Sequence, residues 1–492
     1  MIGLRQVSMS YNKHAAEPIL HDLNLQIAEG ELVLLCGESG CGKSSLLRLL
    51  NGVAHSFCNA SISGDIVLDD QITTYAEPHD LAPYVGSVFQ NPKSQFFTLE
   101  VVSELAFGCE NLGIRPEEIR RQINEVGKDF GIAHLLERQL FALSGGQKQK
   151  VACSSVATMQ PRVLLLDEPS SNLDLEATDE LHGIISHWKA QGRTILVAEH
   201  RLWYLINIVD RVLVMRDGRI AHEFTGDEFR AMDEEALHEL GLRSSKPVPK
   251  TTDKRRAIKE TITLENLWFT YPKSVSPALT IKHAEVPQGQ IIGVVGRNGA
   301  GKSTFVRALT GIEPKAKGAV YMNKSKLSSP RQRLRHSYLV MQDVNHQLFE
   351  ESIDADVTIG TKKLGAEEES YLTEILKALD LDDKRDRHPM SLSGGERQRI
   401  AIASALLSKR EIIVFDEPTS GLDLRRMQKV AQLLDDLARR NKTVLVVTHD
   451  FELLAACCDS LLLVDNGKVF SAETCNSAML KHIEHFIRHG AN

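Results

Sequence analysis

The amino-acid sequence predicts an α/β fold made of two similar domains in tandem. A chain of 492 residues is too long for one ordinary domain, and its composition, 42% hydrophobic and 25% charged, is typical of a globular protein. Short β-rich apolar runs lead into glycine-rich loops, and apolar-periodic helical segments follow these loops. The whole series of segments occurs twice in the same order, so we expect two cored domains of one architecture.

The repeat is visible at every motif. The matching pairs, first copy before second, are LRQVSMSYNK and LENLWFTYPK, GESGCGKS and GRNGAGKS, VFQNPKSQ and VMQDVNHQ, LSGGQ and LSGGE, LLLDEPSSNLD and IVFDEPTSGLD, ILVAEH and LVVTHD. Between the copies, Arg243 to Arg256 is rich in Pro, Ser, Thr and basic residues, which is typical of an extended linker. We therefore predict a first domain at 1–242, a linker at 243–259 and a second domain at 260–492.

Each copy contains the phosphate-binding pattern G-x-x-x-x-G-K-[ST] after a short β-rich run, LVLLC at Leu32 or IIGVV at Ile291. Its glycines let backbone N–H groups converge on phosphate oxygens, its lysine neutralises the β- and γ-phosphates, and its hydroxyl binds Mg²⁺. Both loops are predicted to bind ATP. The predicted residues are Gly37, Ser39, Gly40, Cys41, Gly42, Lys43, Ser44 and Ser45 in the first copy, and Gly296, Asn298, Gly299, Ala300, Gly301, Lys302, Ser303 and Thr304 in the second.

Polar residues at the ends of later strands supply the rest of a phosphate-transfer site. An apolar strand ends in Asp-Glu in each copy, and the next strand ends in a histidine at the same distance from that glutamate. The aspartate is expected to hold Mg²⁺, the glutamate to polarise water, and the histidine to contact the γ-phosphate. The predicted Mg²⁺ ligands are Ser44, Gln90, Asp167, Ser303, Gln342 and Asp416. The predicted catalytic residues are Glu168, His200, Glu417 and His449.

Two further motifs point to nucleotide. LSGGQ and LSGGE each open a polar, helix-favouring run, and a helix N-terminus stabilises an anion. The residues assigned to this anion site are Ser144, Gly145, Gly146, Gln147, Ser393, Gly394, Gly395 and Glu396. Tyr11 and Tyr271 end the first strand of each copy and are predicted to stack on adenine, the competing interpretation being ordinary strand aromatics.

In this order, the phosphate loop, glutamine loop, LSGG signature, DEP, [ST]-x-LD and terminal histidine resemble the nucleotide-binding domains of the ATP-binding-cassette (ABC) superfamily over nearly the whole chain. The resemblance implies tandem P-loop (RecA-like) domains, each with an antiparallel β subdomain and an α-helical subdomain. It also implies a head-to-tail pair within one chain, so that no homodimer is required. LSGGQ would then serve the ATP on Lys302, and LSGGE the ATP on Lys43, with Asp174 and Asp423 in the trans loops. The implied cofactors are ATP and Mg²⁺, and since neither site is degenerate, both are expected to hydrolyse ATP.

The segment FQNPKSQFFTLEVVSELAFGCENLG from Phe89, with EHRL at Glu199, is similar to the fused ATPases of energy-coupling-factor importers, which energise vitamin and metal-ion uptake. This resemblance implies a groove for the coupling helix of a transmembrane scaffold subunit, which in turn carries a small membrane substrate-binding subunit. The groove residues expected are Gln95, Phe96, Gln347 and Phe349. The competing interpretation places Phe96 and Phe97 in the domain's own core. The implied location is peripheral, on the cytoplasmic face of the plasma (inner) membrane.

Composition limits the alternatives. The formal net charge of -7 does not favour nucleic acid, the apolar runs are shorter than the roughly 20 residues that span a bilayer, and no secretory signal is visible. The cysteines form no zinc-type pairs, which sets DNA-repair cassettes aside. Two other classes remain open: the ATPase of another ABC importer, such as a sugar importer, and a soluble tandem-cassette translation factor acting on the ribosome. The imported solute is not encoded in any motif.

Overall fold

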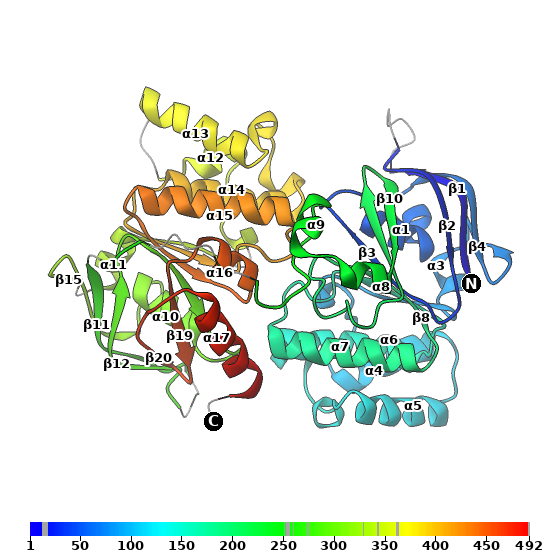
Figure 1. Cartoon of the computed structure of the whole chain (residues 1–492). Helices are drawn as coiled ribbons and strands as arrows, with labels where there is room; N and C mark the ends of the chain where they lie inside the picture. The colour runs from blue at the N-terminus through cyan, green and yellow to red at the C-terminus, as the bar shows by residue number, and fades with distance from the viewer. Residues whose placement is uncertain are drawn as a thin grey trace. The chain divides into compact units, whose positions relative to one another are not determined.

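The computed structural model describes residues 1–11, 18–249, 251, 256–258, 260–272, 274, 276–327, 329–341, 344–360 and 364–490. It divides into two compact units, Met1–Pro247 and Val248–Asn492 (Figure 1). The predicted domain bounds, 1–242 and 260–492, stay a prediction, and residues 250, 252–255 and 259 of the predicted linker lie outside the described part. Three of the described linker residues are anchored. Arg243 and Ser244 are buried in the first unit, whereas Arg256 forms ion pairs with Asp435 and Asp459 of the second.

The first unit contains a four-stranded antiparallel sheet and a six-stranded sheet. The antiparallel sheet has the order β2-β1-β4-β5, with β1 (Ile2–Ser10), β2 (Leu20–Ile27), β4 (Ser61–Leu68) and β5 (Gln71–Ile72). The larger sheet has the order β10-β9-β3-β8-β7-β6, with β3 (Leu32–Gly37), β6 (Val85–Val88), β7 (Val163–Asp167), β8 (Thr194–Ala198), β9 (Arg211–Arg216) and β10 (Arg219–Thr225). Only the β9–β10 pair of this sheet is antiparallel.

The central strand β3 is buried along its whole length because both faces of its sheet are covered. Successive side chains of a strand point to opposite faces. Val33 and Leu35 accordingly pack in one core with Leu46, and Leu32 and Leu34 pack in another with Trp188. The uninterrupted apolar run at Leu32 is therefore the expected sequence of a buried parallel strand.

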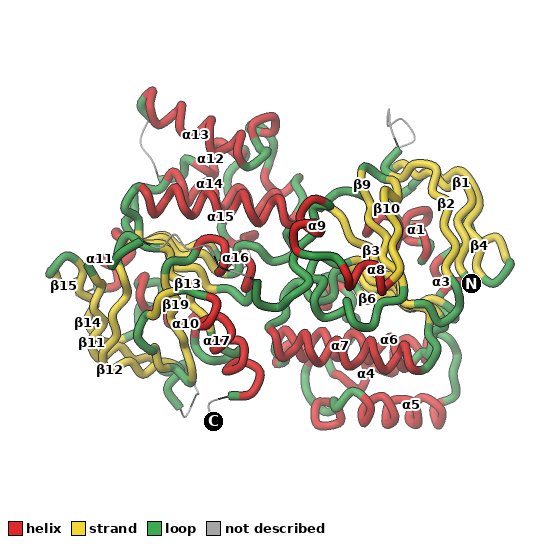
Figure 2. Tube along the Cα trace, in the orientation of Figure 1, coloured by secondary structure: helices red, strands yellow, loops and turns green. Residues whose placement is uncertain are grey.

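Helices cover the strands and form a separate helical part (Figure 2). The helices of the first unit are α1 (Lys43–Leu50), α2 (Val53–Ser56), α3 (Pro78–Leu81), α4 (Val101–Asn111), α5 (Pro116–Asp129), α6 (Gly145–Thr158), α7 (Leu175–Ala190), α8 (Gly226–Ala231) and α9 (Glu234–Glu239). Leu105 of α4, Ile123 of α5 and Val151 of α6 share a small apolar core of their own. This core makes the helical part a distinct subdomain.

The second unit repeats this arrangement. Its antiparallel sheet has the order β12-β11-β14-β15, and its larger sheet has the order β16-β17-β18-β13-β19-β20, with β21 paired to β19. The strands are β11 (Thr261–Phe269), β12 (Leu279–Pro287), β13 (Ile291–Val295), β14 (Lys317–Met322), β15 (Ser325–Leu327), β16 (Ser337–Val340), β17 (Ile412–Asp416), β18 (Thr443–Val447), β19 (Ser460–Asp465), β20 (Lys468–Val469) and β21 (Glu473–Thr474). The helices are α10 (Lys302–Thr310), α11 (Pro330–His336), α12 (Ile353–Val357), α13 (Ala366–Ala378), α14 (Gly394–Leu407), α15 (Leu424–Arg439), α16 (Phe451–Cys457) and α17 (Ser477–His489).

The predicted fold class is confirmed: each unit combines a P-loop α/β core, an antiparallel β subdomain and an α-helical subdomain. Every helix among the described residues is too short or too polar to cross a bilayer.

Candidate nucleotide-binding and hydrolysis sites

The two phosphate loops have the same backbone geometry, which only glycine allows. Gly37 ends β3 with φ 137°, and a Cβ there would lie 2.2 Å from the carbonyl oxygen of Met215. Gly296 directly follows β13 with φ 153°, and a Cβ there would lie 2.1 Å from the carbonyl oxygen of Val464. Both values exclude any side chain. The loops therefore pass directly against the neighbouring strand before α1 and α10 begin.

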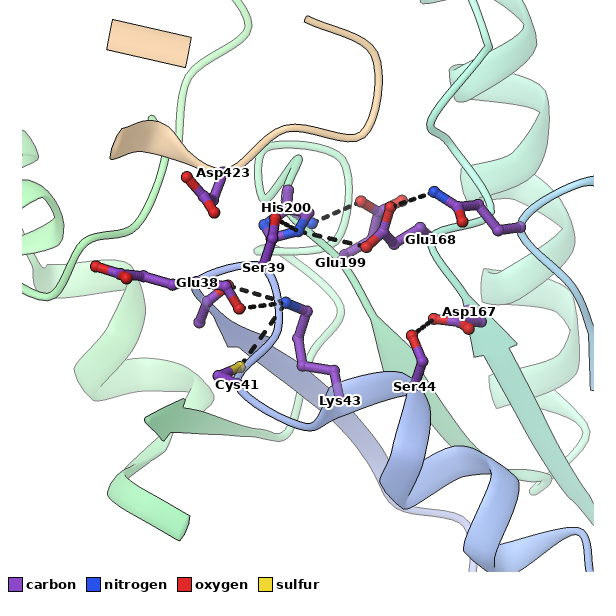
Figure 3. Close-up of polar contacts among 12 residues, drawn as sticks. Glu38, Ser39, Cys41, Lys43, Ser44, Asp167, Glu168, Glu199, His200 and Asp423 are labelled. Carbon is purple, nitrogen blue, oxygen red and sulfur yellow. Dashed lines mark hydrogen bonds and ion pairs between the residues drawn. The ribbon is translucent and has the colours of Figure 1, made fainter. Parts of the chain in front are cut away.

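The lysine of each loop is buried beneath it. Lys43 Nζ donates to the carbonyl oxygens of Gly37 at 2.9 Å and Glu38 at 3.1 Å (Figure 3). Lys302 Nζ makes the same two bonds, to Gly296 at 2.8 Å and Arg297 at 3.0 Å. A fixed ammonium group beside a helix N-terminus is an electropositive site suited to phosphate.

A hydroxyl and a carboxylate meet beside each lysine. Ser44 Oγ donates to Asp167 Oδ1 at 2.8 Å (Figure 3). In the second copy Ser303 Oγ donates to Asp416 Oδ2 at 3.3 Å. Burial raises the pKa of both aspartates, and the serine hydrogen bonds act against that rise. Hard oxygen donors of this kind fit Mg²⁺, which typically takes one or two protein carboxylates together with substrate phosphates. Within the described residues no group of three or more His, Cys, Asp or Glu side chains could hold a metal ion.

Of the glutamines predicted to bind Mg²⁺, Gln342 lies outside the described residues. Gln90 is described, and its Nε2 donates to Glu168 Oε2 at 2.7 Å. The structure thus places Gln90 on the predicted catalytic glutamate, and its role at a metal ion stays a prediction.

The predicted catalytic residues of the first copy lie together. Glu168 follows β7 in the left-handed region, with φ 43°, and its N–H donates to the carbonyl oxygen of Ala198 on β8 at 2.8 Å. His200 Nε2 lies 3.4 Å from Glu168 Oε1 and 3.4 Å from Ser39 Oγ (Figure 3). A carboxylate and an imidazole therefore converge on the phosphate loop, where a water molecule could be oriented.

The second copy has the same pair with a looser contact. Glu417 has φ 52°, and His449 Nε2 lies 3.7 Å from Glu417 Oε1. Thr448 Oγ1 donates to Glu417 Oε2 at 3.0 Å. Among the described residues, Glu168 contacts Gln90 and His200, and Glu417 contacts Thr448 and His449.

Sequence reasoning missed the carboxylate that braces each histidine segment. Glu199 is buried and accepts hydrogen bonds from Tyr204 Oη at 2.9 Å and from the backbone N–H of Ser170 at 3.0 Å and His200 at 2.8 Å. In the second copy the corresponding carboxylate is that of Asp450, which follows His449 in the sequence. Asp450 accepts from Thr419 Oγ1 at 2.7 Å. The repeat alignment contains a signal for this exchange, since Glu-His-Arg in one copy faces Thr-His-Asp in the other.

The LSGG motifs begin helices, as predicted. Ser144 caps α6, with its Oγ accepting from Gln147 N at 3.3 Å and the Gln147 side chain accepting from Ser144 N at 3.1 Å. Ser393 and Glu396 form the same capping box at α14. A Cβ at Gly145, Gly394 or Gly395 would meet nothing within 4 Å, so the backbone there is open to approach. Gly146 differs, because a Cβ there would lie 2.8 Å from Ala177 Cβ of α7.

The two tyrosines lie beside the helices that follow the phosphate loops. Tyr11 Oη donates to Ser45 Oγ at 3.1 Å, and Tyr271 Oη lies 3.0 Å from Thr304 Oγ1. Stacking on adenine stays a prediction for both rings. The residues predicted for the trans loops, Asp174 and Asp423, cap α7 and α15 by accepting backbone N–H groups at 2.9 Å and 2.8 Å.

The predicted groove glutamines brace their own loops. Gln95 Oε1 accepts from Phe89 N at 3.1 Å, and Gln347 Oε1 accepts from Met341 N at 2.8 Å. Phe96 is half-buried against the core of the helical subdomain, as the competing interpretation required for that residue. Its neighbour Phe97 is 74% exposed and Phe349 is 73% exposed. Phe97, and not Phe96, aligns with Phe349 in the repeat, a signal that the predicted residue set overlooked.

Comparison with known proteins agrees with this geometry. The profile of the ABC transporter family matches residues 20–171 and 280–420. The chain belongs to this family. It is an ABC ATPase with two cassettes, and the resemblance expected from the motifs is confirmed.

Relatives of this ABC ATPase match it over nearly its whole length. A predicted ABC transporter ATP-binding protein of Treponema denticola is 40% identical over 479 residues, covering 95% of this chain and 96% of the relative. A second protein of that name from the same organism is 36% identical over 485 residues, covering 97% and 98%.

Solved structures share the fold at lower identity. An RNase-L inhibitor aligns with TM-score 0.64 and 23% identity over 98% of this chain and 92% of that one. A chain of the structure described as ribosome-bound archaeal Pelota and ABCE1 aligns with TM-score 0.69 and 23% identity over 95% of this chain and 78% of that one. At this identity the likeness concerns the fold alone.

Proposed function

We propose that this ABC ATPase energises the uptake of a micronutrient, namely a vitamin, a vitamin precursor or a transition-metal ion, by an importer of the energy-coupling-factor type. Its partners would be a transmembrane scaffold subunit and a small membrane substrate-binding subunit, with the chain bound peripherally at the cytoplasmic face of the membrane. Two composite ATP sites would form when the signature of each cassette closes over the ATP of the other. Closure on ATP and reopening after hydrolysis would drive the membrane subunits.

The observation that carries this proposal is an exposed phenylalanine at the same position of both cassettes. Phe97 and Phe349 each follow the glutamine loop, and each is presented by a turn tied to a buried carboxylate. Large exposed aromatic side chains are typical anchors of protein interfaces. Their recurrence at matched positions supports two equivalent docking points, as expected if two coupling helices are engaged.

A path of hydrogen bonds leads from this turn to the hydrolysis site of the first cassette. Gln95 holds the backbone N–H of Phe89, and the next residue, Gln90, donates to Glu168 at 2.7 Å. A pocket of about 390 Å³ lies beside the same loop, lined by Leu47, Arg48, Asn51, Phe89, Gln90, Ser94 and Asp167 among others. A partner pressing on Phe97 would therefore act on the segment that orients Glu168.

The alternatives are weaker. A translation factor shares the fold, but fold likeness at 23% identity does not transfer a function. The relatives at 40% and 36% identity are instead named for transport. A two-cassette sugar importer is a nearer alternative, although that class usually has one degenerate site and both sites here retain their predicted residues.

Co-purification tests the proposal. The tagged chain, extracted from its native cells in mild detergent, should bring down small and very hydrophobic membrane proteins. The double variant Phe97→Ser with Phe349→Ser should lose them while it retains ATP binding. Phe470→Ser, which removes an exposed phenylalanine elsewhere, is the matched control and should keep them. Recovery of ribosomal proteins without membrane subunits would overturn the proposal.

A further inference from the structure

The second phosphate loop is attached to the last helix described in the chain. Arg297, the second residue of that loop, donates from Nε to the carbonyl oxygen of Ile487 at 2.9 Å. Ile487 lies in the last turn of α17, and Gly490 ends that helix with φ 83°. A Cβ at Gly490 would lie 3.8 Å from Arg297 Nη1, so the guanidinium group packs against the helix end.

The same arginine also holds the phosphate-binding lysine. The backbone carbonyl of Arg297 accepts a hydrogen bond from Lys302 Nζ at 3.0 Å. Arg297 therefore contacts the end of α17 through its side chain and Lys302 through its backbone. The ammonium group of Lys302 is the one expected to bind the β- and γ-phosphates.

Helix α17 is held in place by buried apolar side chains. Leu480, Ile483 and Ile487 are buried along one side of α17. The C-terminus of a helix carries a partial negative charge that attracts a cation such as a guanidinium group. At its other end, Ser477 Oγ lies 3.2 Å from Thr251 Oγ1, next to the segment that joins the two cassettes. The helix thus extends from the joining segment to the phosphate loop.

The first cassette makes a related contact with the opposite charge. Glu38 occupies the position of Arg297, and a Cβ at Gly241, just after α9, would lie 3.5 Å from Glu38 Oε1. A carboxylate at a helix C-terminus lacks the favourable charge interaction that an arginine has there. The second residue of the phosphate loop therefore lies beside the C-terminus of a helix in both cassettes. The favourable interaction with the partial negative charge of the helix end is available to Arg297 and not to Glu38.

We propose that Arg297 is a positioning residue through which α17 sets the affinity of the second cassette for ATP. With Arg297 held by the helix end, the loop carbonyls keep Lys302 in place, and less freedom is lost when phosphate binds. Displacement of α17 releases the loop and weakens ATP binding at this cassette alone. The inference concerns ATP binding and does not depend on what the cassettes energise.

The test isolates the second cassette with the variant Lys43→Ala and measures the affinity for a fluorescent ATP analogue. Arg297→Met should weaken binding about tenfold, equivalent to about 1.4 kcal/mol. Truncation after Glu484, which removes the Ile487 carbonyl and its buried side chain but keeps Leu480 and Ile483, should weaken binding at least as much. Adding Arg297→Met to the truncation should weaken binding no further than the truncation alone, because both changes remove the hydrogen bond between Arg297 and Ile487. Arg297→Lys should recover part of the affinity.

Controls separate coupling from general destabilisation. Arg488→Met alters a neighbouring arginine of α17 that bonds to Glu484 at 3.1 Å, and it should leave the affinity unchanged. In the background Lys302→Ala, which reports the first cassette, Arg297→Met should have no effect. The proposal is overturned by unchanged affinity in Arg297→Met, by additive effects, or by a lowered melting temperature without nucleotide as the sole change.

Discussion

The carboxylate of Glu104 accepts the backbone N–H of Phe97 at 3.0 Å. The same Oε2 atom accepts from the N–H of Thr98 at 2.9 Å and from its hydroxyl at 2.9 Å, and Glu104 is buried. In the second cassette Asp356, also buried, accepts the N–H of Phe349 at 2.9 Å. One buried carboxylate therefore shapes the turn that presents an exposed phenylalanine in each cassette.

Replacing that carboxylate should destabilise the helical subdomain. Glu104→Ala is expected to lower the free energy of unfolding by about 2 kcal/mol, because hydrogen bonds to charged groups contribute more than neutral ones. Thr98→Val, which removes the hydroxyl bond only, should cost about 1 kcal/mol. Thermal unfolding of the purified variants measures both, and equal losses would contradict the role given to the backbone N–H groups.

Removal of the predicted general bases should stop turnover while leaving ATP bound. The double variant Glu168→Gln with Glu417→Gln retains the shape of both side chains but cannot accept a proton from water. Steady-state ATPase activity should fall to background, and filter binding should show retained ATP. Glu125→Gln on α5 is a surface control that should hydrolyse normally. Appreciable turnover in the double variant would refute the assignment.

Because Glu199 holds the histidine segment of the first cassette and Asp450 that of the second, a different substitution should impair hydrolysis in each cassette. With the second cassette silenced by Glu417→Gln, Glu199→Gln should lower kcat about tenfold with little change in KM, since an outer residue that orients a reacting group acts in this range. With the first cassette silenced by Glu168→Gln, Asp450→Asn should do the same. Steady-state ATPase kinetics give both values. An effect on KM alone would indicate that these carboxylates support binding and not hydrolysis.

Glu396 makes the second cassette sensitive to acid. Burial disfavours its ionisation, but Lys384 at 2.8 Å and the hydroxyl and N–H of Ser393 outweigh burial and lower the pKa to about 2. A lowered folded-state pKa adds stability above the unfolded pKa, and that stability is lost as the pH falls from about 5 to about 2. Because solvent screens this partly exposed ion pair, we expect a contribution of no more than about 2 kcal/mol at pH 7.

Unfolding experiments between pH 7 and pH 3 measure this contribution. Glu396→Gln should flatten the pH dependence of the free energy of unfolding over that interval. Lys384→Met should shift the loss of stability toward higher pH, because it removes the ion pair and leaves the carboxylate partly buried. The prediction would be contradicted if the free energy of unfolding of Glu396→Gln fell with pH as steeply as that of the unaltered protein.

Much of this protein follows from its sequence because the relevant interactions are local. The glycines at 37 and 296 are required by left-handed backbone angles next to a neighbouring strand. The serines at 144 and 393 cap helices through residues three positions on. Uninterrupted apolar runs mark strands that are covered on both faces. The fold class, the phosphate loops, the signature helices and the family could therefore be predicted without coordinates.

Tertiary structure decided two kinds of feature: contacts between residues that are distant in the sequence, and which of two adjacent residues faces solvent. Phe96 and Phe97 have the same chemistry, and only the turn held by Glu104 makes one pack inward and the other face solvent. The repeat alignment shows that the carboxylate lies before His200 and after His449, but only the folded chain shows that Glu199 reaches the backbone N–H of Ser170 and Asp450 the hydroxyl of Thr419. Arg297 and Ile487 lie far apart along the chain, and no sequence motif indicates that they are in contact. Local patterns determine the chemistry of the ATP sites, whereas packing of remote segments determines which side chains face partners and which helix holds a phosphate loop.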